Sequence, residues 1–333
     1  MRARAIARLG AFPLLLTVFA VNVWQGTSRE LFNATFSGYK GNRTNNSSAV
    51  SCSNTSVVSD LPLFSKIPRD GILPPYAGNK FGLYTYIMIA PLYRLAFCAV
   101  PKTMSTVLYA SFCFLNYPAT FMSNNRSISH EFWNKSLCES GPYHRKSFTE
   151  MKKAIGEGGT AVTVIRHPVD RFLSGYLFIC HRDEMFSEAE RCYGCRLNLT
   201  CFMENLHQDL IEHSINGTIK NAVSRRTIYH FAPQTWFCDY KDHKNDYEFI
   251  KYERGQEGAR KMAIQFGKFL AGANVPDEFR EMIYDEMLKG TTPHSTYMSP
   301  MRSEVEKQLC SDPNLMEHIL QIYFYDFVEL GFL

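Results

Sequence analysis

Residues 94–106 read Arg-Leu-Ala-Phe-Cys-Ala-Val-Pro-Lys-Thr-Met-Ser-Thr. The apolar run from Arg94 to Val100 is typical of a buried strand, and Pro101 ends it. The residues Ser105–Asn116 then predict a helix. A strand that passes through a tight turn into a helix start leaves unpaired N–H groups and a partial positive charge at the turn. Such a turn favours binding of phosphate or sulfate.

Three polar side chains strengthen this first candidate site. Lys102 adds a full positive charge, and Ser105 and Thr106 add hydroxyl donors in the first helical turn. The Walker pattern G-x-x-x-x-G-K-[ST] is absent, because no glycine lies between Gly82 and Gly141. Taken alone, the stretch fits an anion site as well as it fits a solvated lysine beside an ordinary helix cap.

A second candidate site lies at residues 164–176, Val-Ile-Arg-His-Pro-Val-Asp-Arg-Phe-Leu-Ser-Gly-Tyr. The β-branched run Ala161–Ile165 predicts another buried strand, and Pro168 opens a helix. Arg166 therefore sits at a strand end, where an unpaired guanidinium is costly. Either a bound phosphate or a core carboxylate would pair it. Ser174 follows eight residues later on the helix.

The remaining pattern predicts a third strand at Tyr247–Tyr252 and helices at Ala259–Ala271 and Asp277–Lys289. A last helix begins near Ser311, with Pro313 in its first turn. Strands that alternate with helices indicate an α/β fold with a mostly parallel sheet, in which ligands bind where strands end and helices begin.

Together, the two candidate sites resemble the PAPS-dependent sulfotransferases (PAPS is 3′-phosphoadenosine-5′-phosphosulfate), whose motifs are P-K-x-x-[ST]-T and R-x-P-x-x-R-x-x-S-x-Y. The resemblance implies a P-loop-like, three-layer sulfotransferase fold with PAPS as the donor. It assigns the 5′-phosphosulfate to the first motif and the 3′-phosphate to Arg166 and Ser174. The first motif comprises Pro101, Lys102, Thr103, Met104, Ser105 and Thr106. Met104 departs from the family pattern, where a small residue is common.

Downstream, the stretches 230–238 and 247–253 are similar to the H-x-x-P-Q-x-x-x-C and Y-x-x-I-x-K-Y-E segments of Golgi sulfotransferases, and residues 191–201 and 292–296 resemble a nematode-like branch. The resemblance covers roughly residues 80–333. It implies sulfation of a glycan hydroxyl, with the 4-hydroxyl of N-acetylgalactosamine in chondroitin as the first expectation. Heparan, N-glycan and glycolipid acceptors, and an inactive glycan-binding protein, remain alternatives. No metal or nucleic-acid partner is expected, and a lumenal kinase-like enzyme lacks its Gly-rich loop.

Sulfonate transfer requires stabilisation of the leaving group and a base for the acceptor hydroxyl. Lys102 is placed to stabilise the leaving group. His144 is the first candidate base, because it precedes Arg166 by 22 residues as in some related enzymes, and His230 is the second. Glu131 and Glu150 are carboxylate alternatives.

The first 78 residues indicate a secretory protein and do not predict a further folded domain. Residues 1–25 predict a signal anchor with a short cytoplasmic tail, or a cleaved signal peptide, because arginines precede an apolar run. Residues 26–78 predict a glycosylated stem, and residues 79–333 the catalytic domain. We therefore expect a single-pass type II Golgi membrane protein with a lumenal catalytic domain, or a secreted one after cleavage.

Glycosylation acceptors and cysteines support the lumenal address. Nine N-x-[ST] sequons begin at Asn33, Asn42, Asn45, Asn46, Asn54, Asn125, Asn134, Asn198 and Asn216. The ten cysteines are an even number and predict disulfides in an oxidising compartment. Zinc binding is the alternative for the C-x-x-C formed by Cys192 and Cys195.

Overall fold

The computed structural model describes residues 71–77, 83–131, 136–289, 296 and 299–332. All of them belong to one unit, which spans residues 50–333. The predicted anchor, most of the stem, residues 292–295 of the nematode-like stretch and six of the sequons lie outside the described residues.

A five-stranded mixed sheet forms the centre of the fold. Its strands are β1 (Ile87–Ala90), β2 (Leu95–Cys98), β3 (His144–Arg145), β4 (Thr160–Arg166) and β5 (Tyr247–Tyr252). They lie in the order β3-β1-β2-β4-β5. The strands β2, β4 and β5 pair in parallel, whereas β1 runs antiparallel to both β2 and β3. The α/β class is therefore confirmed, and the parallel part of the sheet carries both candidate sites.

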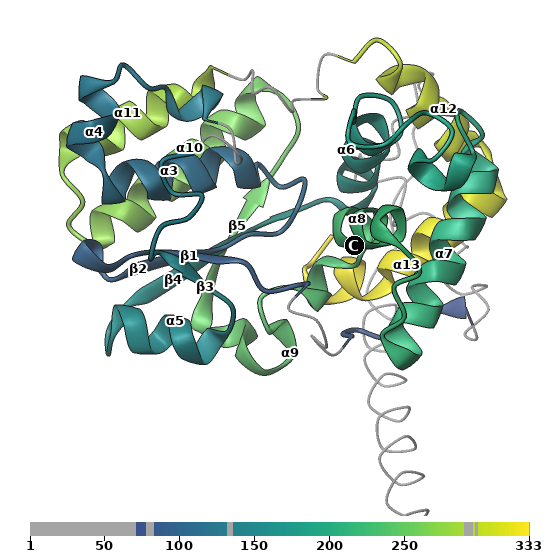
Figure 1. Cartoon of the computed structure of the whole chain (residues 1–333), viewed down its shortest axis with the longest axis horizontal. Helices are drawn as coiled ribbons and strands as arrows, with labels where there is room; N and C mark the ends of the chain where they lie inside the picture. Colours follow the sequence, from purple (N-terminus) through teal and green to yellow (C-terminus); the bar gives the residue numbers. More distant parts are fainter. Residues whose placement is uncertain (1–70, 78–82, 132–135, 290–295, 297–298, 333) are drawn as a thin grey trace, which may run out of the picture. The chain divides into compact units, whose positions relative to one another are not determined.

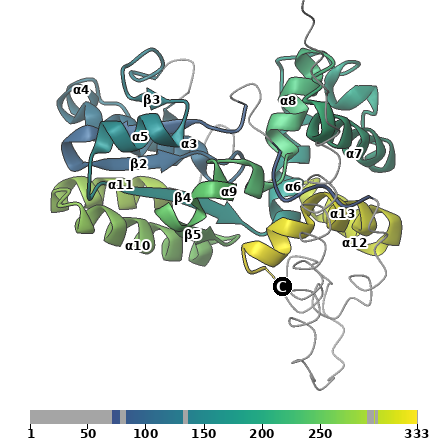
Figure 2. The same ribbon diagram turned by 90° about the horizontal axis from the view of Figure 1, so that it is seen from below.

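Helices cover both faces of this sheet in the described chain. They are α3 (Ser105–Asn116), α4 (Pro118–Ser123), α5 (Phe148–Ile155), α6 (Pro168–Ile179), α7 (Leu199–Asn216), α8 (Ala222–Phe231), α9 (Tyr240–His243), α10 (Gln256–Gly272), α11 (Asp277–Leu288), α12 (Arg302–Ser311) and α13 (Pro313–Glu329). The helices α3, α10 and α11 lie on one face and α5 on the other (Figure 1). The helices α6, α7, α8, α12 and α13 gather to one side of the sheet in both views (Figure 2).

Two hydrophobic clusters follow from the alternation of side chains along the strands. On β1, Met88 faces the cluster of α3, α10 and α11, whereas Ile87 and Ile89 face the cluster that contains α5, α6, α7 and α13. The cluster that contains α5, α6, α7 and α13 is the larger. It extends from the sheet into the group of helices beyond β4, so these helices share a core with the sheet.

The predicted elements that flank the candidate sites are present. The helix Ser105–Asn116 and the strand Tyr247–Tyr252 have the predicted bounds, and the strand around Ala161–Ile165 extends by one residue at each end. The strands β1 and β3 were not predicted, and they make the sheet mixed rather than uniformly parallel. Both are short, and β1 is buried at all four positions, so neither shows a period-two pattern.

The packed chain begins earlier than the predicted domain boundary at residue 79. Leu73 is buried, and its N–H donates to Gln321 O at 3.0 Å. The Trp236 indole N–H donates to Pro74 O at 2.8 Å, and the His207 ring contacts Gly71 O at 2.7 Å. Residues 71–77 are thus part of the domain surface. No helix among the described residues is long and apolar enough to span a membrane.

Disulfides connect the described cysteines, as predicted. The pairs are Cys98–Cys238, Cys113–Cys138, Cys180–Cys192 and Cys195–Cys201, and no described cysteine is a free thiol. The two cysteines of the C-x-x-C belong to different disulfides, which rules out a zinc site there. The Cys98–Cys238 bond ties the end of β2 to the segment after the H-x-x-P-Q stretch.

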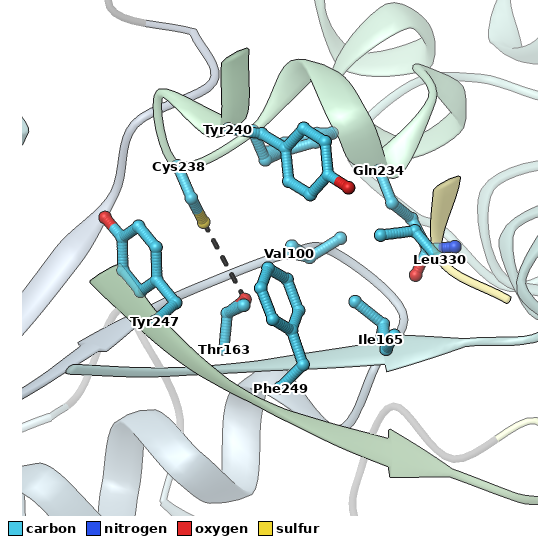
Figure 3. A pocket seen from close by; sticks show the side chains of 10 residues that line it. Val100, Thr163, Ile165, Gln234, Cys238, Tyr240, Tyr247, Phe249 and Leu330 are labelled. Atoms are coloured by element: carbon cyan, nitrogen blue, oxygen red, sulfur yellow. Dashed lines mark hydrogen bonds between the residues drawn. The ribbon is translucent and has the colours of Figure 1, made fainter. Parts of the chain in front are cut away.

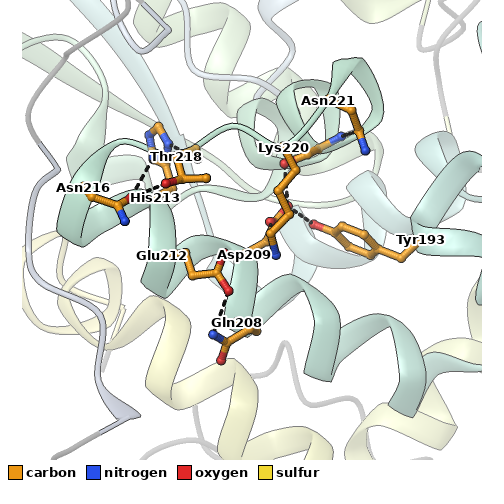
Figure 4. Close-up of polar contacts among 10 residues, drawn as sticks. Tyr193, Gln208, Asp209, Glu212, His213, Asn216, Thr218, Lys220 and Asn221 are labelled. Atoms are coloured by element: carbon orange, nitrogen blue, oxygen red, sulfur yellow. Dashed lines mark hydrogen bonds and ion pairs between the residues drawn. The ribbon is translucent and has the colours of Figure 1, made fainter.

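A buried carboxylate anchors the segment that contains the C-x-x-C. Asp209 on α7 accepts hydrogen bonds from Tyr193 Oη at 2.9 Å and Ser224 Oγ at 2.7 Å, and it pairs with Lys220 Nζ at 3.1 Å (Figure 4). These contacts join the segment around Tyr193 to α7 and α8. Asn216 ends α7 within the same region, and its side chain is exposed.

Candidate active site

The first motif forms a strained turn between β2 and α3. Lys102 and Met104 both adopt left-handed backbone conformations, with φ of 69° and 62°. Such conformations are costly for residues other than glycine and persist where the surroundings fix them. The Thr103 hydroxyl donates to Val100 O at 2.8 Å, which closes the turn. Because α3 begins at Ser105, its first backbone N–H groups lack acceptors within the helix.

Two arginines from the second motif hold this turn from behind. Arg166 Nη1 donates to Lys102 O at 3.1 Å, and Arg171 Nε donates to Pro101 O at 2.9 Å. Arg171 is fully buried and also donates to Ala232 O at 2.8 Å. Its guanidinium is thus occupied by backbone carbonyls, and its role is to support the turn. These contacts confirm that the two motifs, about 60 residues apart in sequence, meet in space.

The Lys102 ammonium lies 3.8 Å from the centre of the Phe178 ring on α6. The residue is half-buried. Burial of the ammonium holds the pKa of Lys102 well below its ordinary value, and the positive charges of Arg166 and Arg226 lower it further. Asp183 acts in the opposite direction. A site with so little hydration and so much positive charge favours an anion.

Arg166 presents an unsatisfied donor at the end of β4. The residue is 7% exposed, its guanidinium lies 4.9 Å from the centre of the Tyr252 ring, and its Nε is buried without a hydrogen-bond partner. Ser174 Oγ lies 3.1 Å from the Thr296 hydroxyl, and both residues are buried. Buried donors without acceptors are uncommon in proteins, and Arg166 Nε is available to an anionic ligand.

Arg302 adds a second guanidinium to this region. It is 6% exposed, forms a buried ion pair with Asp170 on α6, and leaves its own Nε buried without a partner. Burial and the nearby Arg166 charge lower the pKa of Arg302. Two guanidinium groups with unused buried donors match the charge and the acceptor capacity of a phosphate.

Comparison with known proteins identifies the family. The sequence model of the Sulfotransferase family matches residues 85–332. The chain belongs to the sulfotransferase family. An uncharacterized protein of Caenorhabditis elegans is 31% identical over 79% of this chain and 72% of its own length. The carbohydrate sulfotransferase chst-1 of the same organism is 30% identical over 80% of both chains, and the putative sulfotransferase vep-2 is 29% identical over 65% of this chain and 67% of its own length. No solved structure matches.

Family membership makes this chain a PAPS-dependent sulfotransferase, and its residues fit that donor. Lys102 and the start of α3 could hold the 5′-phosphosulfate. Arg166, Ser174 and Arg302 could hold the 3′-phosphate. No group of three or more His, Cys, Asp or Glu side chains among the described residues is arranged to hold a metal ion.

The two candidate bases, His144 and His230, have different neighbours. His144 on β3 lies 2.6 Å from Cys138 O through its Nε2, and its ring packs on Tyr86 and Tyr109. These contacts lie toward the edge strand of the sheet. His230 on α8 instead contacts Phe178, with 6.1 Å between the ring centres. Phe178 is the ring that Lys102 covers, so His230 and Lys102 contact the same aromatic side chain.

The carboxylate alternatives are occupied by local structure. Both oxygens of Glu131 bind the Arg126 guanidinium, at 2.8 and 2.9 Å. Glu150 accepts from Lys146 N at 3.0 Å, while its own N–H donates to Ser147 Oγ at 3.2 Å. The second contact is the N-cap of α5, in which the Ser147 hydroxyl accepts from Glu150 N.

Sequence reasoning missed several residues of the site. Phe178, Arg226 and Arg302 were not singled out, because each acts only through its tertiary neighbours. Gln234 was read as part of the H-x-x-P-Q resemblance without a role. The signal for Gln234 was its place inside that motif, and no local pattern marks the other three.

A small pocket lies between β4, β5 and α9. Uncharged residues line it, among them Val100, Thr163 and Tyr247 (Figure 3). Thr163 Oγ1 lies 3.7 Å from Cys238 Sγ there.

Proposed function

We propose that this sulfotransferase transfers the sulfonate group of PAPS to a glycan hydroxyl, and that its acceptor is the 4-hydroxyl of N-acetylgalactosamine in a chondroitin-type chain. The observation that carries the donor assignment is the pair of buried, unused guanidinium donors on Arg166 and Arg302, beside the turn that holds Lys102. A nucleotide with anionic groups at both its 5′ and its 3′ positions would supply acceptors to both regions.

PAPS, when bound, supplies the sulfonate group and a stable nucleotide leaving group. Lys102 would donate a proton or a hydrogen bond to the oxygen that bridges sulfur and the 5′-phosphate as negative charge gathers there. The low hydration of its ammonium makes this stabilisation stronger than it would be in water. Arg166 and Ser174 would hold the other end of the nucleotide and thereby fix the direction of attack.

His230 is the base that we propose. The acceptor oxygen must approach the sulfur close to Lys102, so the base must lie on the same side of the turn. His230 shares the Phe178 ring with Lys102, whereas the recorded contacts of His144 lie with Tyr86, Tyr109 and Cys138. The bond from sulfur to the acceptor oxygen forms, the bond to the nucleotide oxygen breaks, and the hydroxyl proton passes to the His230 imidazole.

One observation supports a glycan as the acceptor. A relative with 30% identity is named a carbohydrate sulfotransferase. The choice of chondroitin rests on the resemblance of the stretch 230–253.

We also propose that the catalytic domain faces the Golgi lumen and is tethered by an N-terminal anchor. The disulfides require an oxidising compartment. The described sequon asparagines Asn125, Asn198 and Asn216 are all exposed, as glycosylation requires. Digestion of the full-length protein with a glycosidase, followed by carbonate extraction of membranes, tests both parts of this proposal.

The decisive experiment uses the full chain with radiolabelled PAPS and a panel of desulfated chondroitin, dermatan, heparosan and N-glycan acceptors. Disaccharide analysis of the labelled product then locates the sulfate. We expect label on the 4-position of N-acetylgalactosamine. Label on another chain would refute the acceptor, and binding of PAPS without transfer to any acceptor would favour a glycan-binding protein.

A further inference from the structure

The carboxamide of Gln234 forms two hydrogen bonds with the backbone of Arg166. Gln234 Oε1 accepts from Arg166 N at 2.9 Å, and Gln234 Nε2 donates to Arg166 O at 2.8 Å. Gln234 is 3% exposed. A carboxamide has one accepting and one donating end, so it can satisfy both the N–H and the C=O of a single residue as a neighbouring strand would.

These two hydrogen bonds lie at the end of β4, beyond the point where β2 stops pairing with it. The β2–β4 ladder ends at the pair Cys98 and Thr163, because the chain after Cys98 leaves to form the donor turn. On the other edge, β4 stays paired with β5 as far as Arg166 and Tyr252. Gln234 therefore replaces the missing β2 neighbour at the residue that carries the 3′-phosphate guanidinium.

A buried carboxylate fixes Gln234 in turn. Asp326 on α13 is fully buried. It accepts from Gln234 N at 2.8 Å, from Gln234 Nε2 at 3.2 Å and from Thr235 N at 3.1 Å. A buried carboxyl group that accepts from three N–H groups is held in one orientation. Asp326 on α13 thus holds Gln234, and Gln234 in turn holds the end of β4.

We infer that Gln234 and Asp326 are positioning residues for Arg166, and that this pair sets the preference of the enzyme for a donor with a 3′-phosphate. The inference rests on the proposed donor function, in which Arg166 binds that phosphate. A guanidinium pairs with phosphate only when its planar fork is aligned. Release of the Arg166 peptide from Gln234 would let this fork rotate, while the turn that binds the 5′ side keeps its support from Arg171.

The test compares two donors, PAPS and adenosine 5′-phosphosulfate, which lacks the 3′-phosphate. Gln234→Leu keeps the side-chain volume and removes both bonds to Arg166. We expect its kcat/KM for PAPS to fall about tenfold or more, with a change below about threefold for adenosine 5′-phosphosulfate. Tyr323→Phe is the matched control, because it removes a buried hydrogen bond from α13 to Phe231 O and leaves Gln234 intact. Its donor preference should equal that of the wild type.

Equal losses for both donors, or an unchanged donor preference in Gln234→Leu, would overturn the inference. If Gln234→Leu does not fold, Gln234→Asn serves instead, since its side chain is one methylene shorter and cannot reach both groups of Arg166. A wild-type enzyme that uses both donors equally well would refute the assignment of Arg166 itself. That outcome is read on the wild type alone and is therefore distinct from failure of Gln234.

Discussion

The donor turn and the turn around Cys192 both contain left-handed residues other than glycine, and they are held in different ways. The donor turn has Lys102 and Met104 in this conformation and is held by hydrogen bonds from buried arginines. The turn around Cys192 and Tyr193 has the same kind of backbone and is held by disulfides on both sides. Covalent bonds fix the second turn without any ligand.

The comparison separates strain that serves chemistry from strain that serves architecture. In the donor turn, the charges that hold the backbone are those that we propose bind the nucleotide, so a change there is expected to alter function before stability. In the disulfide-bonded turn, covalent bonds on both sides fix the backbone, so a change there is expected to alter stability before function. Four experiments test this difference.

The largest effect is expected for Lys102→Ala. Turnover should fall about a thousandfold, because the charge on the leaving oxygen loses its stabilisation. The free energy of unfolding should change by less than about 1 kcal/mol, since a loop lysine contributes little packing. Radiolabelled transfer and thermal unfolding measure the two quantities. Lys152→Ala is the control, because Lys152 also lies over a phenylalanine ring, 5.9 Å from its centre, but on α5.

Removal of the disulfide between Cys180 and Cys192 gives the opposite result. The double substitution Cys180→Ser with Cys192→Ser should lower the free energy of unfolding by about 3 kcal/mol, because it releases a short loop in the unfolded chain. Turnover per folded molecule should stay within about threefold of wild type. Chemical denaturation and active-site titration with PAPS measure these effects. A loss of turnover as large as that of Lys102→Ala would abolish the distinction between the turns.

The base comes next. His230→Ala should lower turnover about a hundredfold, whereas His144→Ala should keep more than about a tenth of it. The reason is the shared contact of His230 and Lys102 with Phe178. The affinity for PAPS, measured by calorimetry, should be retained in both variants. The reverse order of activities would return the role of base to His144.

The smallest of the four effects is expected for Arg166→Lys. Lysine keeps the charge but not the planar fork, so PAPS affinity should fall about tenfold. Adenosine 5′-phosphosulfate should bind the wild type weakly and lose little on this substitution. Calorimetric titration with both nucleotides checks the result, and losses of equal size would mean that Arg166 serves the donor turn alone through its bond to Lys102 O.

The sequence predicted the donor half of the fold well because its signals are local. A strand, a turn and a helix start occupy consecutive residues from Arg94 to Thr106, and the bounds of α3 agree with the prediction. The strand β1 was missed because its four buried residues show no alternation. Its antiparallel pairing with β2 and β3 makes the sheet mixed. Which strands pair, and in which direction, cannot be predicted from the residues of one strand alone.

The same reason applies to the candidate site. Lys102, Arg166 and Ser174 could be proposed from the sequence because they stand in short motifs. Gln234 and Arg302 could not be assigned a role, since their partners are the backbone of Arg166 and the carboxylate of Asp170. For the histidines, spacing along the chain favoured His144, whereas the contact with Phe178 favours His230 as the residue to test first.

The contacts of residues 71–77 bear on how a soluble form of the enzyme should be cut. A truncation at residue 79, the boundary suggested by composition, would leave the Trp236 indole N–H without its acceptor at Pro74 and would uncover the surface beneath Leu73. Gly71 is also tightly seated, because a Cβ there would come within 2.7 Å of the Gln321 side chain. An expression boundary upstream of Gly71 would keep residues 71–77 in place and would avoid exposing an apolar surface on the truncated enzyme.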